Sequence, residues 1–212
     1  MAAKETKERI LDVAEALFAE NGYSGTSLRA VTTAAGANLA AVNYHFGSKR
    51  TLLRAVFERL SGPANTERLA LLDRLEAVSA QPELEDILRA FLTPALRVVV
   101  DLGDRGHTAT RFLGRIAGDP AGDVQAMIAE EFMVVTERFL AAFARALPDL
   151  GDDELGWRFK LMVGVLIHVQ ADEQWKAELP RRPKPADIEV IRDRTVAFLA
   201  AGFRGPTAAS SE

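Results

Sequence analysis

The sequence TSLRAVTTAAGANLAAVNYHFGSK spans residues 26–49 and contains two short helical patterns separated by a glycine. The first pattern begins at Ser27, whose hydroxyl can cap a helix, and places apolar residues at helical spacing. Gly36 suits the left-handed residue that ends a helix, and Asn38 is a good N-cap for a second helix over residues 39–46. Two helices joined by a tight turn are typical of the helix-turn-helix, whose second helix enters the DNA major groove.

The distribution of charge agrees with a surface that lies against DNA. The chain has 26 Lys and Arg, 30 Asp and Glu and a net charge of −4, yet residues 21–57 contain no Asp or Glu. The same stretch carries four cations, which are Arg29, Lys49, Arg50 and Arg54. The first 60 residues hold 8 basic and 6 acidic side chains, and the remainder holds 18 and 24. A mildly positive segment beside an acidic remainder favours phosphate contact, although a neutral helical hairpin is the alternative interpretation.

The motif NYHFGSK at residues 43–49 completes a segment that resembles the DNA-binding head of the tetracycline-repressor (TetR) family. The match covers about the first 60 residues, and the rest is similar only in its helix layout. The resemblance implies an all-α protein with a three-helix DNA-binding head at 1–48. A helical ligand-binding and dimerisation body would follow at 49–205, and a disordered tail at 206–212. The strings EDILRAFLTPALR and WRFKLMVG look similar to fatty-acid-responsive members, which suits an acyl or other apolar effector.

The second helix of the motif has two faces that predict different roles. Val42 and Phe46 are apolar and four residues apart, so they are expected to face inward. Leu39, Ala40 and Asn43 then lie on the outer side, where a methyl can contact thymine and an Asn can bind adenine. Asn43 stands where the family more usually has Tyr, so the operator cannot be transferred from relatives.

The resemblance adds backbone contacts that would set the register on DNA without recognising bases. Tyr44, His45 and Lys49 are the expected phosphate contacts, although His45 could instead be a surface or capping histidine. The full predicted set of DNA-binding residues is Thr26, Ser27, Arg29, Asn38, Leu39, Ala40, Ala41, Asn43, Tyr44, His45 and Lys49.

Apolar residues at helical spacing predict helices throughout the remaining chain. The expected ranges are 4–20, 49–60, 65–78, 82–102, 107–117, 123–146, 152–176 and 186–203. Ser61, Gly62 and Pro63 are expected to break or kink the helix that begins at Lys49, because Pro supplies no N–H. Pro94 is expected to bend its helix. Acidic residues 152–154 favour a helix N-terminus over a metal site, because they meet the helix dipole there.

Two functional regions of the body follow from the resemblance. A ligand pocket would lie among the helices of residues 84–169, lined by Phe91, Leu92, Leu96, Val99, Phe112, Ile116, Met127, Phe132, Phe139, Met162 and Leu166. His107, Arg111 and His168 could orient a polar head group, and plain core is the alternative for each apolar residue. The last two helices would form a homodimer through Phe159, Val163, Gly164, Ile167, Ile188, Ile191, Thr195, Phe198, Leu199 and Gly202.

Composition argues against several other classes of protein. The chain has no Cys, its three His have no ligand spacing, and no phosphate-binding glycine loop occurs. We therefore expect no metal, no cofactor and no enzyme. The N-terminus lacks the apolar core of a signal peptide and no run approaches 18 apolar residues, which predicts a cytoplasmic protein. The predicted function is a homodimeric repressor that binds double-stranded operator DNA and is released by a small apolar effector. A DNA-binding activator and an all-α ligand-binding protein without repression remain alternatives.

Overall fold

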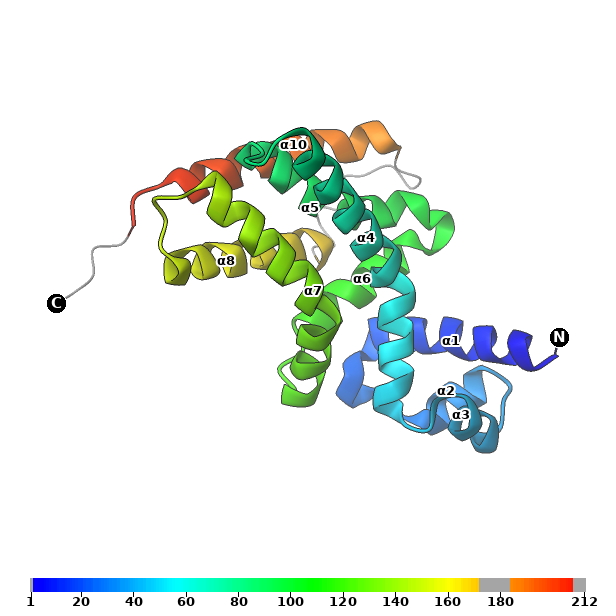
Figure 1. Cartoon of the computed structure of the whole chain (residues 1–212). Coiled ribbons are helices and arrows are strands. Elements are labelled where there is room, and N and C mark those ends of the chain that lie inside the picture. Colours follow the sequence, from blue (N-terminus) through cyan, green and yellow to red (C-terminus); the bar gives the residue numbers. More distant parts are fainter. Residues whose placement is uncertain (1, 172–183, 208–212) are drawn as a thin grey trace.

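The computed structural model describes residues 2–171 and 184–207, and its regular structure in these two ranges is helical throughout (Figure 1). The all-α class predicted from the sequence is therefore confirmed. In chain order the elements are α1 (Ala2–Gly25), α2 (Leu28–Ala34), α3 (Leu39–Phe46), α4 (Lys49–Val78), α5 (Leu84–Asp101), a 3-10 turn η1 (Gly103–Arg105), α6 (Gly106–Ala117), α7 (Gly122–Ala146), α8 (Asp152–Ala171) and α10 (Pro185–Arg204). The predicted end of the helix at 152–176, most of the PRRPKP segment and most of the predicted tail lie outside the described residues.

The head consists of α1, α2, α3 and the first turns of α4 (Figure 1). Its apolar centre contains the residues expected there, namely Phe18, Val31, Val42 and Phe46, with Leu17 half-buried against them. α1 is interrupted at Gly22, where φ is 72°, close to the predicted helix end at residues 21–22. Side-chain spacing alone was sufficient to identify this centre, because one face of each short helix must be buried.

α4 connects the head to the body as one helix (Figure 1). Residues 61–63 were predicted to break or kink this helix; the break is wrong, because α4 continues through Pro63. The missing N–H of Pro63 removes one helical hydrogen bond. Beside it, Ser61 Oγ donates to the carbonyl of Phe57 at 2.8 Å, and Thr66 Oγ1 donates to the carbonyl of Gly62 at 3.0 Å. Burial of apolar residues on both sides of Pro63 favours continuation of the helix.

The body packs α5, α7, α8 and α10 around the second half of α4. α5 lies at its centre, and Pro94 is accommodated inside that helix. α10 packs against α5, and Arg204 donates to the two carboxylate oxygens of Glu85 at 2.5 and 2.8 Å. Within the described ranges, no helix is both long and apolar enough to cross a membrane.

α6 lies between the head and the body, against α1 on one side and α8 on the other. The ring of Phe112 on α6 is centred 6.4 Å from the ring of Phe18 on α1 and 6.4 Å from that of Phe57 on α4. The apolar cluster of the head therefore continues into α6 and the start of α7. The head therefore shares one close-packed apolar cluster with α6 and α4.

A charge cluster reinforces the same junction. Glu15 on α1 is 2% exposed, and its Oε2 accepts hydrogen bonds from Arg59 of α4 at 2.6 Å and from Arg105 at 2.5 Å. Asp12, which is exposed, accepts a further bond from Arg59 at 2.8 Å. A buried carboxylate is tolerated when cations pair with it in this way, so Glu15 ties the head to both α4 and the beginning of α6.

Candidate nucleic-acid interface and body cavity

The helix-turn-helix segment is held in shape by its own polar side chains. Ser27 Oγ accepts from the backbone N–H of Ala30 at 3.1 Å, and Asn38 Oδ1 accepts from that of Ala41 at 2.7 Å. Both predicted N-caps are therefore confirmed. Gly36 has a φ of 56°, the left-handed conformation predicted for the residue that ends α2. Because both ends of the turn are satisfied locally, α3 is presented on the head in a defined orientation.

α3 has one buried face and one exposed face. Val42 and Phe46 are buried, as their spacing predicted. Leu39 is 51% exposed and Tyr44 is 85% exposed. Asn43 is exposed as well. Large apolar and aromatic side chains left in solvent on a well-packed head indicate a contact surface.

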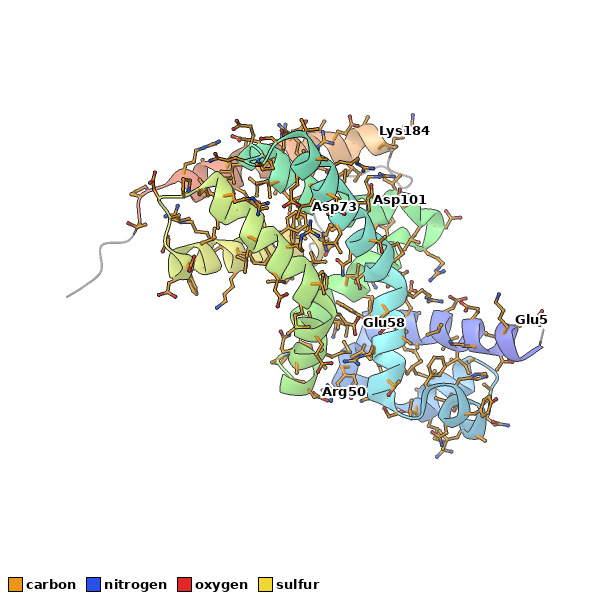
Figure 2. The ribbon with its side chains drawn as sticks, in the orientation of Figure 1. Glu5, Arg50, Glu58, Asp73, Asp101 and Lys184 are labelled. Atoms are coloured by element: carbon orange, nitrogen blue, oxygen red, sulfur yellow. The ribbon has the colours of Figure 1, made fainter. Side chains whose placement is uncertain are left out.

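The other predicted DNA contacts surround this exposed face. Ser27, Arg29, Asn38 and Ala40 are exposed, and Ala41, His45 and Lys49 are half-buried. Arg50, one of the four cations of residues 21–57, is exposed at the head end of α4 (Figure 2). Because residues 21–57 contain no Asp or Glu, this surface carries cations without a competing carboxylate from its own segment.

Two of the predicted contacts, Thr26 and Lys49, have partners inside the head. Thr26 is 2% exposed, and its hydroxyl donates to the carbonyl of Gly22 at 2.8 Å. The ammonium of Lys49 donates to the carbonyls of Tyr23 at 2.9 Å and Thr26 at 3.0 Å, and it lies 4.2 Å from the centre of the Tyr23 ring. These contacts join the start of α4 to the segment that precedes α2. Both side chains therefore position the helix-turn-helix.

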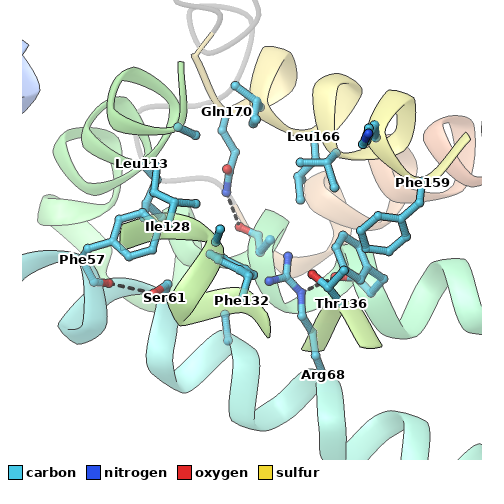
Figure 3. Close-up of a pocket in the computed structure, with 18 of the residues that line it drawn as sticks. Phe57, Ser61, Arg68, Leu113, Ile128, Phe132, Thr136, Phe159, Leu166 and Gln170 are labelled. Carbon is cyan, nitrogen blue, oxygen red and sulfur yellow. Dashed lines mark hydrogen bonds between the residues drawn. The ribbon is translucent and has the colours of Figure 1, made fainter. Parts of the chain in front are cut away.

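A cavity of about 530 Å³ lies in the body between α4, α5, α6, α7 and α8 (Figure 3). Its size is within the range of sites for small organic ligands. Three of the predicted pocket residues line it, namely Phe91, Phe132 and Leu166. Most of the remaining wall is also apolar, including Phe57, Leu113, Ile128, Leu140 and Phe159.

The other predicted pocket residues are not part of this wall. Eight of them are buried in the apolar cores, namely Leu92, Leu96, Val99, Phe112, Ile116, Met127, Phe139 and Met162. On α6, His107 is half-buried and Arg111 is exposed. The difference comes from helix phase. On α5, Phe91, Ala95 and Val98 line the cavity, so the residues next to them point toward neighbouring helices.

The sequence prediction missed a charged residue in the cavity wall, Arg68 of α4. Arg68 is 2% exposed; its Nε donates to the carbonyl of Phe91 and its Nη1 to Asn65 Oδ1, both at 2.7 Å. The guanidinium carbon lies 4.3 Å from the centre of the Phe91 ring and 5.6 Å from that of Phe132. Burial lowers the pKa of Arg68 to about 10, so the group still carries its charge at neutral pH.

The predicted dimer residues divide between the inside and the outside of the body. Three of them line the cavity, namely Phe159, Val163 and Ile167. On α10, two are buried (Ile188 and Leu199) and two are half-buried (Ile191 and Thr195). The exposed ones are Gly164, Phe198 and Gly202. The outer faces of α8 and α10 also expose Trp157, Leu161 and Val190, which the sequence did not single out. Large apolar side chains left exposed on a well-packed body make the outer faces of these two helices candidates for an interface.

Acidic residues 152–154 occupy the first turn of α8, the helix N-terminus predicted for them. Among the side chains that the structure describes, no group of three His, Cys, Asp or Glu could hold a metal ion.

Comparisons with known proteins agree with this arrangement. Residues 10–56 match the model of bacterial regulatory proteins of the tetR family, and residues 89–202 match that of the tetracyclin repressor-like C-terminal domain. The chain is 26% identical over 202 residues to the HTH-type transcriptional regulator CymR of Pseudomonas putida, covering 92% of this chain and 94% of that protein. It is 43% identical over 56 residues to the HTH-type transcriptional regulator AcrR of Shigella flexneri, covering 26% of each.

Solved structures show the same fold. A TetR-family regulator from Streptomyces coelicolor A3 aligns with a TM-score of 0.61 at 20% identity, covering 94% of this chain and 91% of that one. The fatty acid degradation regulator FadR of Bacillus halodurans aligns with a TM-score of 0.61 at 14% identity, covering 95% and 97%. The head matches one family model and more than half of the chain matches the other. The chain therefore belongs to the TetR family of bacterial regulatory proteins, and it is a DNA-binding transcriptional regulator rather than an enzyme.

Proposed function

We propose that this regulator is a homodimeric repressor, which a small, mostly apolar effector releases from its operator in the cytoplasm. One observation carries the proposal. The head exposes α3 on a segment, residues 21–57, that contains no Asp or Glu, while the cavity in the body is walled partly by α4 and α6, the two helices that hold the head. DNA binding and ligand binding thus share structural elements.

In the proposed complex, α3 enters the major groove. Leu39, Ala40 and Asn43 face the base edges, with Asn43 as the residue able to form a bidentate contact with adenine. Tyr44, His45, Arg29, Ser27 and Arg50 contact the phosphate backbone. We assign Thr26 and Lys49 to positioning, because their polar atoms are used within the head.

Dimerisation is proposed through the outer faces of α8 and α10. Phe198 is 70% exposed on α10, and Val190 of α10 and Trp157 and Leu161 of α8 are exposed large apolar side chains on the same pair of helices. A two-fold interface would place two heads about 34–36 Å apart, one helical turn of DNA, so each head can bind one half-site.

Release is proposed to result from a change in the packing of α4 and α6. Phe57, Leu60 and Ser61 of α4 and Leu113 of α6 line the cavity. The ring of Phe57 also contacts Phe112, which packs against α1 of the head. An effector that binds one arrangement better than the other by about 1–3 kcal/mol would shift the spacing of the heads and weaken operator binding accordingly.

Selection from random-sequence DNA duplexes tests the DNA-binding part of the proposal, followed by mobility shifts at several salt concentrations. We expect a two-fold symmetric consensus. Asn43→Ala should reduce the preference for that consensus over random DNA by about 1–3 kcal/mol, because the base contact is lost. Gln81→Ala, an exposed amide in the body, is the control and should leave the preference unchanged. Enrichment of no sequence, or an Asn43→Ala variant with the original preference, would contradict the proposed docking.

A further inference from the structure

We infer that the effector is an organic anion, specifically a monocarboxylic acid with an apolar aliphatic or aromatic body, whose carboxylate is bound by Arg68 inside the cavity. The inference deepens the proposed function and rests on it, because it names the chemical class of the compound that would occupy the cavity.

The first observation is a buried cation without an anion. Arg68 donates one hydrogen bond from Nε and one from Nη1, to a carbonyl and an amide oxygen. A guanidinium has five N–H groups, so three form no hydrogen bond within residues 2–171 and 184–207. Over the same ranges Arg68 has no carboxylate partner. A buried charge of this kind is costly unless something pairs with it.

Arg158 shows how this chain satisfies another buried arginine. Its Nε donates to Glu154 Oε1 at 2.7 Å, and its other nitrogens donate to backbone carbonyls, including that of Phe203 at 2.7 Å. Arg158 therefore has both a carboxylate and a set of acceptors around it, as a structural arginine should. Arg68 differs from Arg158 because it faces a cavity and several of its N–H groups form no hydrogen bond within the described residues.

The second observation is the charge of the cavity wall. Its lining residues within the described chain include two cations, Arg68 and the exposed Lys160, and no Asp or Glu. The surrounding sequence is acidic, with 24 Asp and Glu against 18 Lys and Arg after residue 60. An acid-free wall in an acidic body favours an anionic ligand over a neutral or cationic one.

The third observation is the arrangement of polar and apolar groups. In Figure 3, Arg68 extends from α4 into the cavity between Phe132 and Thr136, while Gln170 enters from the opposite wall. The planar guanidinium can bind the two oxygens of a carboxylate in parallel. Phe159 and Ile128 belong to the apolar wall that would surround the rest of the ligand. With one buried cation in the lining, a singly charged anion suits the site better than a polyanion.

Calorimetric titration of the whole protein with matched ligand pairs tests this inference. Octanoate is compared with octanamide and octylamine, and 4-butylbenzoate with 4-butylbenzamide, at pH 7.5. We expect the acid of each pair to bind at least about tenfold more tightly than the amide, which corresponds to about 1.4 kcal/mol. The amine should bind more weakly than the amide. The same acids should release the protein from DNA in a mobility shift.

Variants identify the residue responsible. Arg68→Met should bind acid and amide within about twofold of each other while retaining amide and operator binding. Arg68→Lys keeps the charge but loses the planar fork, so its acid preference should be intermediate. Arg74→Met, an exposed arginine on the same helix, is the matched control and should behave as the unaltered protein.

The outcomes separate this inference from the function on which it rests. A neutral compound that binds and releases DNA as well as its matched acid overturns the anion while leaving effector control intact. An unaltered acid preference in Arg68→Met overturns the role of Arg68. If Arg68→Met does not fold, the acid–amide comparison in the unaltered protein and the Arg68→Lys variant decide the matter. Absence of binding by acids, amides and amines alike would refute the inference that the cavity takes a monocarboxylic acid with such an apolar body.

Discussion

Replacing Lys49 by Met separates a positioning role from a phosphate contact. The ammonium of Lys49 holds the carbonyls of Tyr23 and Thr26 at 2.9 and 3.0 Å and lies over the ring of Tyr23. Met retains the apolar stem and the helix propensity of Lys, so the change removes mainly these polar contacts.

The expected loss of stability follows from the contacts removed. A hydrogen bond from a charged donor contributes about 1.5–3 kcal/mol, and Lys49 is half-buried, so the lower end applies to each of its two bonds. The cation–ring contact adds about 0.5–1 kcal/mol. Discounting the sum for solvent exposure, we expect the free energy of unfolding to fall by about 3 kcal/mol. For a protein of this size that corresponds to a decrease in Tm of roughly 6–12 °C.

The assay combines calorimetry with the salt dependence of DNA binding. A positioning role predicts a lower Tm and weaker DNA binding, with an unchanged slope of log K against log salt. Arg50→Met is the control, because Arg50 is the next residue on α4 and its side chain is exposed. The Arg50→Met protein should keep its Tm. The magnitude of its slope of log K against log salt should fall by about 0.9 for each phosphate contact removed. A Lys49→Met protein with unchanged Tm and a reduced slope would refute the assignment of Lys49 to positioning.

Three further predictions concern other parts of the molecule. Phe198→Asp should convert the dimer to a monomer in sedimentation experiments while keeping its helical circular dichroism, because the side chain lies outside the monomer core; a Phe198→Asp dimer would move the interface elsewhere. Asn38→Ala should lower the free energy of unfolding by about 1 kcal/mol in urea denaturation through loss of the α3 cap, and an unchanged midpoint would show that the cap contributes nothing. Hydrogen bonding to Arg204 lowers the pKa of Glu85 from 4.5 to about 2, so the pair stabilises the fold above pH 4.5 and this contribution disappears as the pH falls toward 2. Glu85→Gln should therefore be less stable than the unaltered protein by up to about 1 kcal/mol at pH 7 and equally stable near pH 2, whereas a difference independent of pH would exclude the ion pair as its cause.

The head was predicted well because its structure depends on local interactions. Ser27, Gly36 and Asn38 act within three or four residues of their own positions, through caps and a left-handed turn that the sequence displays directly. The burial of Val42 and Phe46 likewise follows from the period of one helix. Such features require no knowledge of the rest of the fold.

Arg68 was missed although its position contained a clue. Leu60, Ala64, Arg68 and Leu72 follow one another at intervals of four residues, so the arginine lies on the buried stripe of α4. The predicted break at residues 61–63 interrupted this stripe, and the continuity of α4 was needed to place Arg68 on it. The cavity wall was misjudged for a related reason: Phe91 and Leu92 are adjacent apolar residues, and only the neighbouring helices determine which of them faces an open space.

The helix-turn-helix, its caps and the exposed face of α3 could thus be derived from the amino-acid sequence, since they follow from helix period and from hydrogen bonds between residues close in the chain. The tertiary structure was required for everything that joins distant segments. It places Lys49 against residues 23–26, Glu15 between two arginines, and Arg68 inside the cavity between α4, α5, α6, α7 and α8. The physical reason is that side-chain burial and pairing across helices depend on how the helices pack, which no local pattern specifies.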